Sequence, residues 1–325
     1  MKDTTNVDAT APCNNWAIAI HGGAGTIPRN GSPEKREAAA RGLRNALQVG
    51  RDMLQNGTDA IEVVEAVVKT LEDDPNFNAG KGAVFTEEGT HELDASIMDG
   101  SNRRTGAVAA VRTVRNPIVL ARLVMTETPH VLIAADGAET FADEVDVQRV
   151  PNEYFNTEHR RAALDRVLAG REAADDSPER PNPRGGSTVG CVAVDARGRL
   201  AAATSTGGMT AKRWGRVGDS PIVGAGTWAD DRVAVSGTGT GEEFIRWGVA
   251  QDVAALVEYR GLSLEDAAVE VVDGKLRPGD GGVICVDHSG AIAMVFNSTG
   301  MYRGAANSDG LFKIAIWDEP LTPSK

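Results

Sequence analysis

The chain has 325 residues, of which 41% are hydrophobic, and its formal net charge at pH 7 is −12. This hydrophobic share can fill a sizeable core, so the composition favours a folded chain over a disordered one. The acidic balance argues against a nucleic-acid partner, and no apolar run reaches the roughly 18 residues that a membrane span needs.

Further expectations about environment and ligands follow from composition. The first fifteen residues lack an apolar signal core, which favours a cytoplasmic protein, and the excess of acidic residues suggests a surface adapted to high salt. The 3 cysteines and 5 histidines have neither disulfide-framework nor metal-site spacing. Cys191 and Cys285 lie in apolar runs and are expected to be buried thiols. We therefore predict no metal or cofactor in the reaction.

The first half of the chain predicts strands that alternate with helices. An apolar strand over residues 16–20 runs into residues 21–25 (HGGAG), which have the composition of a turn. Ser32 and Pro33 predict the start of a long helix, and Thr58 is expected to cap a second one. The following elements are predicted as a loop over 75–82, a hairpin around Glu88-Gly89, a strand over 106–114, a helix from 117, a strand over 130–134 and a helix over 135–146.

The second half begins after a polar, breaker-rich segment over residues 156–186, which we interpret as a flexible approach to Thr188. Further strands are predicted over residues 188–194, 199–206, 221–226, 232–237, 282–287 and 291–297, with one long helix over 241–260. Because hairpins link several of these strands, the pattern favours mainly antiparallel sheets in an α+β fold.

Thr188 stands where the polar segment meets a dense apolar run. A threonine hydroxyl is a weak nucleophile unless a base lies beside it, and the α-amine of the same residue can act as that base if the threonine is N-terminal. A free α-amine has a pKa of about 7.7–8.0, so a useful fraction is unprotonated near neutral pH. Thr188 is thus a candidate nucleophile that self-cleavage would expose. An ordinary strand threonine remains the alternative.

Other polar residues follow predicted strands. Alternation along a strand places Thr204 and Thr206 on the same face. Residues 236–241 (SGTGTG) open a helix, whose N-terminal N–H groups suit a developing oxyanion. Arg216 can bind a carboxylate with two hydrogen bonds, and Asp219 can bind an ammonium, so the pair can hold the two charged groups of an amino acid. A surface ion pair is the alternative for each.

The same glycine-rich turn invites a nucleotide-binding interpretation. The strand, the turn and the helix match the order of a dinucleotide fingerprint. However, the motif requires glycine at position 242, which is Glu242 here, and a carboxylate would repel a pyrophosphate. Nucleotide binding is therefore disfavoured.

Taken together, the motifs resemble the plant-type (type III) L-asparaginase/isoaspartyl peptidase family of the Ntn-hydrolase superfamily. The similar runs are AIAIHGGAGTI, FNAGKGAVFT, HELDASIMDG, RNPIVLARLVM, STVGCVAVD, AAATSTGGMTAKRWGRVGDSPIVGAG, SGTGTGEEFIR and FNSTGMYR. They span nearly the whole chain. The resemblance implies a single Ntn-hydrolase domain over 1–325, a four-layer αββα sandwich, and self-cleavage into an α subunit (1–187) and a β subunit (188–325). It also implies an (αβ)₂ heterotetramer.

The resemblance further implies the activity and the site. The enzyme would hydrolyse L-asparagine to L-aspartate and ammonia, and would cleave β-aspartyl (isoaspartyl) dipeptides. Related enzymes carry a sodium-binding loop, which here corresponds to Leu71–Lys81. The implied roles are Thr188 as nucleophile, Thr206 as its hydrogen-bonding neighbour, Thr238 and Gly239 as the oxyanion hole, Arg216, Asp219 and Gly241 as substrate ligands, and Asn78 as a support.

One position departs from the family pattern. The residue before the nucleophile is usually glycine in this branch or aspartate in glycosylasparaginases, whereas here it is Ser187. Cleavage one bond earlier, which would expose Ser187, stays open. Two other functions also stay open: a glycosylasparaginase, and an unprocessed protein that binds amino acids through Arg216 and Asp219.

Overall fold

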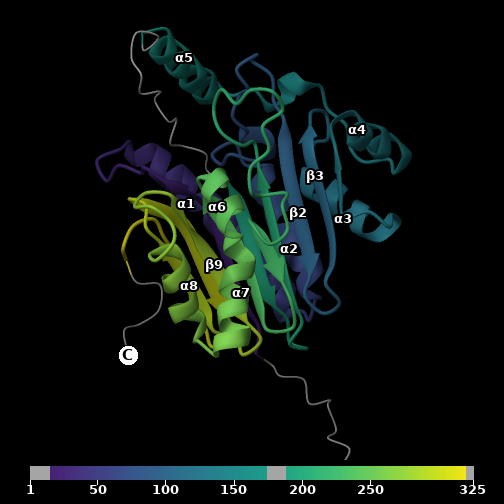
Figure 1. Cartoon of the computed structure of the whole chain (residues 1–325), viewed down its shortest axis with the longest axis vertical. Helices are drawn as coiled ribbons and strands as arrows, with labels where there is room; N and C mark the ends of the chain where they lie inside the picture. The colour runs from purple at the N-terminus through teal and green to yellow at the C-terminus, as the bar shows by residue number, and fades with distance from the viewer. Residues whose placement is uncertain (1–14, 174–187, 320–325) are drawn as a thin grey trace, which may run out of the picture.

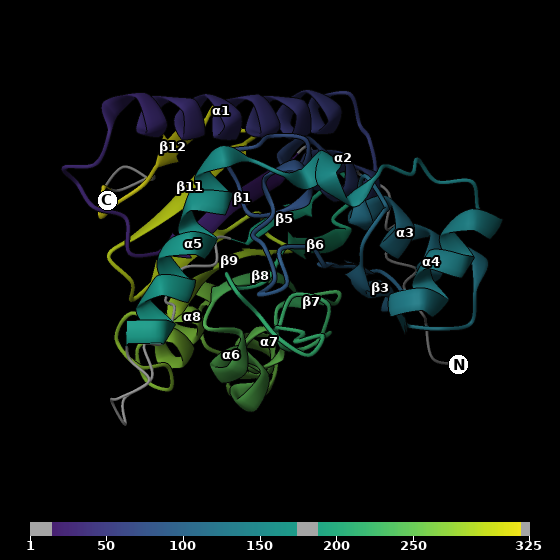
Figure 2. The ribbon, with the colours of Figure 1, turned by 90° about the horizontal axis from the view of Figure 1, so that it is seen from above.

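The computed structural model describes residues 15–173 and 188–319, which form four layers (Figure 1). Two β-sheets pack face to face, and helices cover the outer face of each sheet. Seen from above, α1 and α2 lie along one outer side, and α6 and α7 lie along the other (Figure 2). This architecture confirms the expected αββα sandwich.

The larger sheet has eight strands in the order β12-β11-β1-β5-β6-β2-β3-β4. All neighbours are antiparallel except β3 and β4, which are parallel. Its strands are β1 (Ala17–Gly25), β2 (Leu93–Asp99), β3 (Arg104–Val111), β4 (Leu132–Ala134), β5 (Val189–Val194), β6 (Leu200–Thr206), β11 (Gly300–Asn307) and β12 (Phe312–Ala315). Strand β5, which follows Thr188 directly, therefore lies in the middle of the sheet.

The smaller sheet has four antiparallel strands in the order β10-β9-β8-β7. They are β7 (Thr227–Ala229), β8 (Val233–Gly239), β9 (Gly281–Asp287) and β10 (Ile292–Phe296). The helices are α1 (Pro33–Gln55), α2 (Ala60–Glu72), α3 (Pro117–Glu127), α4 (Ala135–Glu144), α5 (Glu158–Ala173), α6 (Gly241–Trp247), α7 (Val249–Arg260) and α8 (Leu264–Val272). Two short 3₁₀ turns are η1 (Gly80–Gly82) and η2 (Asn152–Phe155).

Each interface between layers has its own apolar core. Alternate residues of β5 show this directly, because successive side chains of a strand point to opposite faces. Cys191 packs in the core under α1 and α2, whereas Val192 packs in the core between the two sheets. Cys285 packs between the smaller sheet and α7 and α8. Both cysteines are fully buried, as predicted, and the two-sided burial explains why the central strands are apolar throughout.

Several elements differ from the sequence-based prediction. The HGGAG segment is not a turn but the end of β1, with a bulge between His21 and Gly23. Gly22 in this segment is required by packing, since a Cβ there would collide with the ring of Phe77. The long helix predicted over 241–260 is interrupted at Gly248, which has a left-handed φ of 58°.

The expected hairpin around Glu88-Gly89 forms only a turn, closed by the Thr86 N–H on the Thr90 carbonyl at 2.8 Å. The strand that follows it, β2, pairs with β3 and β6 instead. Residues 221–226 form a turn rather than a strand, because Gly224 has a φ of 90°.

The remaining differences concern helix ends and missed elements. Residues 158–173 of the supposed flexible approach form α5, while residues 174–187 lie outside the described part of the chain. Asp59, not Thr58, precedes α2. The sequence reading also missed α8, β11 and β12. By contrast, Ser32 caps α1 as predicted, its Oγ accepting from the Lys35 N–H at 3.3 Å.

Candidate active site

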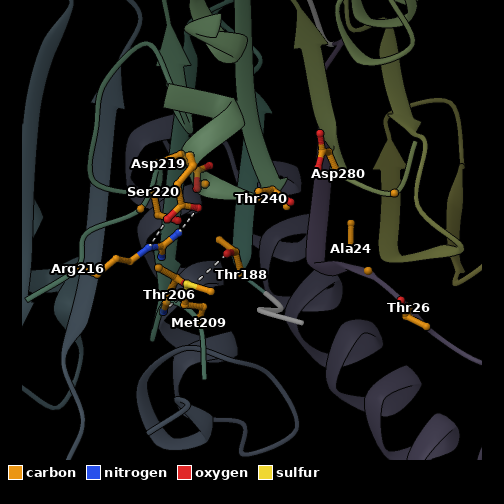
Figure 3. A pocket seen from close by; sticks show the side chains of 17 residues that line it. Ala24, Thr26, Thr188, Thr206, Met209, Arg216, Asp219, Ser220, Thr240 and Asp280 are labelled. Carbon is orange, nitrogen blue, oxygen red and sulfur yellow. Dashed lines mark hydrogen bonds and ion pairs between the residues drawn. The ribbon is translucent and has the colours of Figure 1, made fainter. Parts of the chain in front are cut away.

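A pocket opens where β1, β6 and β8 end and β5 begins (Figure 3). The residues that line it include six predicted site residues. The lining comprises Ala24, Gly25, Thr26, Thr188, Thr206, Gly208, Met209, Arg216, Gly218, Asp219, Ser220, Gly239, Thr240, Gly241, Glu242, Gly279 and Asp280. The two sheets thus bring together segments that are far apart in the sequence.

Thr188 and Thr206 meet at the centre of this pocket. The Thr188 hydroxyl donates to Thr206 Oγ1 at 3.2 Å, and the same Thr206 oxygen accepts from the Gly208 N–H at 3.0 Å (Figure 3). Both threonines are buried except for the surface facing the pocket. The bond suits a neighbour that orients the Thr188 hydroxyl, which is the arrangement expected for Thr206.

Asn78 lies behind the pocket and holds the turn after β6. Its side-chain Nδ2 donates to the Gly208 carbonyl at 2.7 Å, and its main-chain carbonyl accepts from the Gly207 N–H at 3.1 Å. The side-chain Oδ1 accepts from the Val84 N–H at 2.8 Å. The first two bonds tie the loop before β2 to the turn that follows Thr206, and the third fixes Asn78 within its own loop. Asn78 is therefore positioned to support the site without lining it.

The two residues predicted to form the oxyanion hole differ in their exposure to the pocket. Gly239 lines the pocket, whereas Thr238 is fully buried and is absent from the lining formed by residues 15–173 and 188–319. The Thr238 hydroxyl accepts from the Ala24 N–H at 3.1 Å. Since a hydroxyl can also donate, its proton remains available for an acceptor at the pocket edge. The oxyanion role of both residues stays a prediction.

Arg216 is held by a partner that sequence reasoning did not assign. Its Nε and Nη2 each donate to one carboxylate oxygen of Glu242, both at 2.9 Å. Burial alone would raise the pKa of Glu242, but the hydrogen bonds and charge of Arg216 outweigh it and lower that pKa. Glu242 therefore stays ionised and fixes the guanidinium plane, leaving Nη1 directed toward Gly218 and Gly208.

Asp219 lies beside this ion pair. Burial raises the pKa of Asp219 to about 7, although the charge of Arg216 lowers it in part. No donor among the described residues reaches its buried Oδ2. A Cβ at Gly241 would lie 3.0 Å from Asp219 Oδ1 and 2.8 Å from Arg216 Nη2. Glycine at 241 thus lets the main chain approach both charged groups more closely than a residue with a Cβ could.

Sequence reasoning missed Glu242 and His21 as parts of the site. From the sequence, Glu242 was considered only as a carboxylate that would repel a pyrophosphate. An arginine expected near the N-terminus of a helix is a reason to look for a carboxylate partner in the first turn of that helix. His21 was placed in a turn, whereas it is fully buried and hydrogen-bonded to Thr188. No pattern in the sequence indicated that contact.

The Leu71–Lys81 loop has features that fit a hard cation. A Cβ at Gly80 would collide with the carbonyl oxygen of Glu72, and a Cβ at Gly82 would collide with that of Phe77. Main-chain oxygens therefore crowd the inside of the loop, and hard cations prefer oxygen ligands. Among the described residues, no group of three or more His, Cys, Asp or Glu side chains is arranged to hold a metal.

The four-layer sandwich, with a threonine at the start of a central strand and facing a pocket, is the architecture of an Ntn-hydrolase. Comparisons with known proteins narrow this class. A profile described as asparaginase matches residues 14–316, and the chain belongs to this family. In the parts of the chain that the structure describes, no helix is both long and apolar enough to cross a membrane.

Three relatives illustrate the similarity. The chain is 46% identical to the probable isoaspartyl peptidase/L-asparaginase 2 of Arabidopsis thaliana, covering 93% of this chain and 99% of that protein. It is 51% identical to the isoaspartyl peptidase of Salmonella typhimurium, covering 89% and 95%. It is 50% identical to the isoaspartyl peptidase of Escherichia coli, covering 88% and 91%.

Proposed function

We propose that the protein cuts its own chain before Thr188 and then hydrolyses L-asparagine and β-aspartyl dipeptides. The observation that carries the proposal is the meeting of Thr188 and Thr206 with Arg216 and Asp219 around one pocket. The names of the relatives, isoaspartyl peptidase and L-asparaginase, support the same pair of substrates.

Self-cleavage would use the same hydroxyl as turnover. Thr188 Oγ attacks the carbonyl carbon of residue 187, the peptide C–N bond breaks, and the acyl group moves to oxygen as an ester. Water then hydrolyses this ester, which restores the hydroxyl and leaves a free amine on Thr188. Ser187, the predicted last residue of the α subunit, lies outside the described residues.

Turnover would follow in two steps. The freed Thr188 amine accepts the hydroxyl proton while Oγ attacks the side-chain carbonyl of the substrate. The Thr238 hydroxyl and the Gly239 N–H would stabilise the oxyanion, and ammonia or a peptide amine leaves after it accepts the proton. Water then hydrolyses the β-aspartyl ester to release aspartate.

Substrate selection would rest on the charged residues. Arg216 would hold the α-carboxylate, with Asp219 and the Gly241 carbonyl holding the α-ammonium. Both substrates share this aspartyl head and differ only beyond the leaving nitrogen, so one pocket accepts both.

The remaining properties are also proposals. Sodium held by carbonyls of the Leu71–Lys81 loop would brace the segment that carries Asn78, without entering the reaction. The processed protein would form an (αβ)₂ assembly in a cytoplasmic, salt-rich environment. Sedimentation of the processed protein checks the assembly, and thermal melting across a potassium chloride series checks the salt adaptation.

The decisive experiment combines processing with product release. Purified protein is followed on denaturing gels, the fragments are sequenced from their N-termini, and ammonia release from L-asparagine is measured. We expect a fragment that begins at Thr188 and an active enzyme. A fragment that begins at Ser187 would show that Ser187, and not Thr188, is the N-terminal nucleophile. An active chain that remains intact at 34.1 kDa would refute the mechanism. Hydrolysis of N-acetylglucosaminyl-asparagine instead of L-asparagine would indicate a glycosylasparaginase.

A further inference from the structure

His21 is a fully buried histidine that contacts Thr188 but does not line the pocket. Its Nδ1 lies 3.0 Å from the Thr188 carbonyl oxygen, and its Nε2 lies 3.0 Å from Ser236 Oγ. Because a carbonyl can only accept a hydrogen bond, the proton of the neutral ring must be on Nδ1, and Nε2 must accept from Ser236.

This assignment orders a chain of buried hydroxyls behind the nucleophile. Ser236 Oγ lies 2.7 Å from Thr204 Oγ1, Thr227 Oγ1 lies 2.6 Å from Thr204 Oγ1, and Ser96 Oγ lies 2.8 Å from Thr227 Oγ1. If Ser236 gives its single proton to His21, Thr204 must donate to Ser236, and Thr227 to Thr204. Thr204 and Thr227 then both donate toward the histidine, while Ser96 Oγ also lies 2.6 Å from the Ser220 carbonyl, which can accept its proton. This order agrees with a histidine protonated on Nδ1.

The surroundings of His21 are shaped for this pair of contacts. A Cβ at Gly190 would collide with both Ser236 Oγ and His21 Nε2, so glycine in β5 makes room for them. Burial lowers the pKa of His21 to about 3, against a smaller opposing effect from its bond to the Thr188 carbonyl. The ring is therefore neutral at physiological pH, and its protonated nitrogen faces a carbonyl rather than the nucleophilic oxygen.

We propose that His21 is a positioning residue that holds the carbonyl of Thr188, and thereby the amine and hydroxyl, after self-cleavage. This inference rests on the proposed function. Before cleavage, the chain on both sides restrains Thr188. Afterwards its N-terminal side is free, and the residue depends on its own contacts and on the strand that follows. A donor on its carbonyl fixes ψ, which sets how Cα presents the amine and Oγ to the substrate.

Two substitutions of His21 separate its two hydrogen bonds. In His21→Asn the amide nitrogen can take the place of Nδ1 and still donate to Thr188. In His21→Gln the longer side chain reaches toward Ser236 and no longer bonds Thr188. We expect His21→Gln to lose about 10²-fold in kcat per processed site with KM nearly unchanged, since a misplaced nucleophile costs about this much. His21→Asn should remain within about tenfold of the wild type.

His91 provides a matched control. It is also a buried histidine whose Nδ1 bonds a main-chain carbonyl, that of Val84 at 3.1 Å. His91→Gln should lower thermal stability to a similar degree but leave kcat per processed site close to that of the wild type. Counting processed sites by gel densitometry removes differences in self-cleavage from the comparison.

The outcomes distinguish this inference from the proposed function. A wild-type enzyme that releases no ammonia refutes the proposed function. An active wild type with equal kcat losses in His21→Gln and His21→Asn, or an equal loss in His91→Gln, overturns the positioning role. Nitrogen-15 NMR of labelled histidine gives a second test that does not need a variant. We expect a neutral ring protonated on Nδ1, and a proton on Nε2 would overturn the proposal.

Discussion

Two parts of the candidate site differ in the kind of group from which they are built. The nucleophile part, Thr188, Thr206 and Thr238, contains hydroxyls backed by a neutral imidazole. The charged part, Arg216, Asp219 and Glu242, contains three ionisable side chains in contact or close together. Hydroxyls and main-chain groups can orient a reacting atom through neutral hydrogen bonds. Binding the carboxylate and ammonium groups of an amino acid instead requires charged side chains held in fixed positions. We therefore predict that substitutions in the hydroxyl part change turnover and that substitutions in the charged part change substrate affinity.

Removal of the nucleophile gives the largest expected effect. Thr188→Ala should abolish both self-cleavage and turnover, because the same Oγ performs both reactions. Thr188→Ser keeps a hydroxyl and should retain both at reduced rates. Denaturing gels and ammonia release measure the two properties, and a processed or active alanine variant would remove Thr188 from the proposed role.

A large loss is also expected at Thr238. Thr238→Ala should lower kcat by about 10²–10³-fold if its hydroxyl donates to the oxyanion. Thr238→Ser, which keeps the donor, should recover most of that loss. Steady-state kinetics on L-asparagine test this point. If the alanine variant bound substrate more weakly and kept its kcat, Thr238 would contribute to substrate binding and not to stabilisation of the oxyanion.

A smaller effect should arise from the partner of Arg216. Glu242→Gln keeps the shape but removes the charge that fixes the guanidinium plane, so KM should rise by about tenfold with kcat nearly unchanged. The same experiment sharpens the comparison of the two parts. A fall in kcat at constant KM would show that recognition and reactivity are coupled.

The pH dependence of substrate affinity provides a further test. Burial raises the pKa of Asp219 to about 7, so below this pH the carboxyl is largely neutral and binds an ammonium poorly. KM for L-asparagine should therefore fall as pH rises through about 7 and level off above it. Asp219→Asn should raise KM and remove this dependence. A wild-type KM that is constant across this range would contradict the assignment.

The smallest expected effect concerns stability rather than turnover. Burial raises the pKa of Glu72 to about 8, partly opposed by its bond from Ser205 Oγ at 2.7 Å. An acid whose pKa is higher in the folded state binds more protons when folded, so it lowers stability as pH rises from its unfolded pKa through about 8. The free energy of unfolding should fall by at most about 1.4 kcal/mol per pH unit in this range.

Glu72→Gln removes this titration. The variant should melt with a weaker pH dependence than the wild type between about pH 5 and 8. Calorimetry at several pH values checks the expectation, with Glu65→Gln as a less buried helical control whose carboxyl pKa is also raised by burial. An unchanged slope would show that Glu72 is ionised in the folded protein.

Local sequence patterns were enough to predict the order of most strands and helices, since apolar runs and capping residues act over short distances. Ser32 and Pro33 specified the start of α1, and the pattern around Thr188 specified a buried strand after a polar segment. The same motifs indicated the family and named the residues that line much of the pocket. The strands and helices follow from short-range periodicity and capping, whereas the family and several site residues, Asn78 and Thr238 among them, were implied only by the resemblance of the motifs to known proteins.

The contacts between side chains that are distant in the sequence are visible only in the folded protein. The carboxylate of Glu242 on Arg216 and the imidazole of His21 on the Thr188 carbonyl join residues 26 and 167 positions apart. The HGGAG segment continues a strand because Phe77 packs on Gly22, and Gly248 divides one predicted helix into two. Such outcomes depend on how the layers stack and on which buried polar groups become neighbours. Local sequence patterns do not encode the distances between residues that are far apart in the chain.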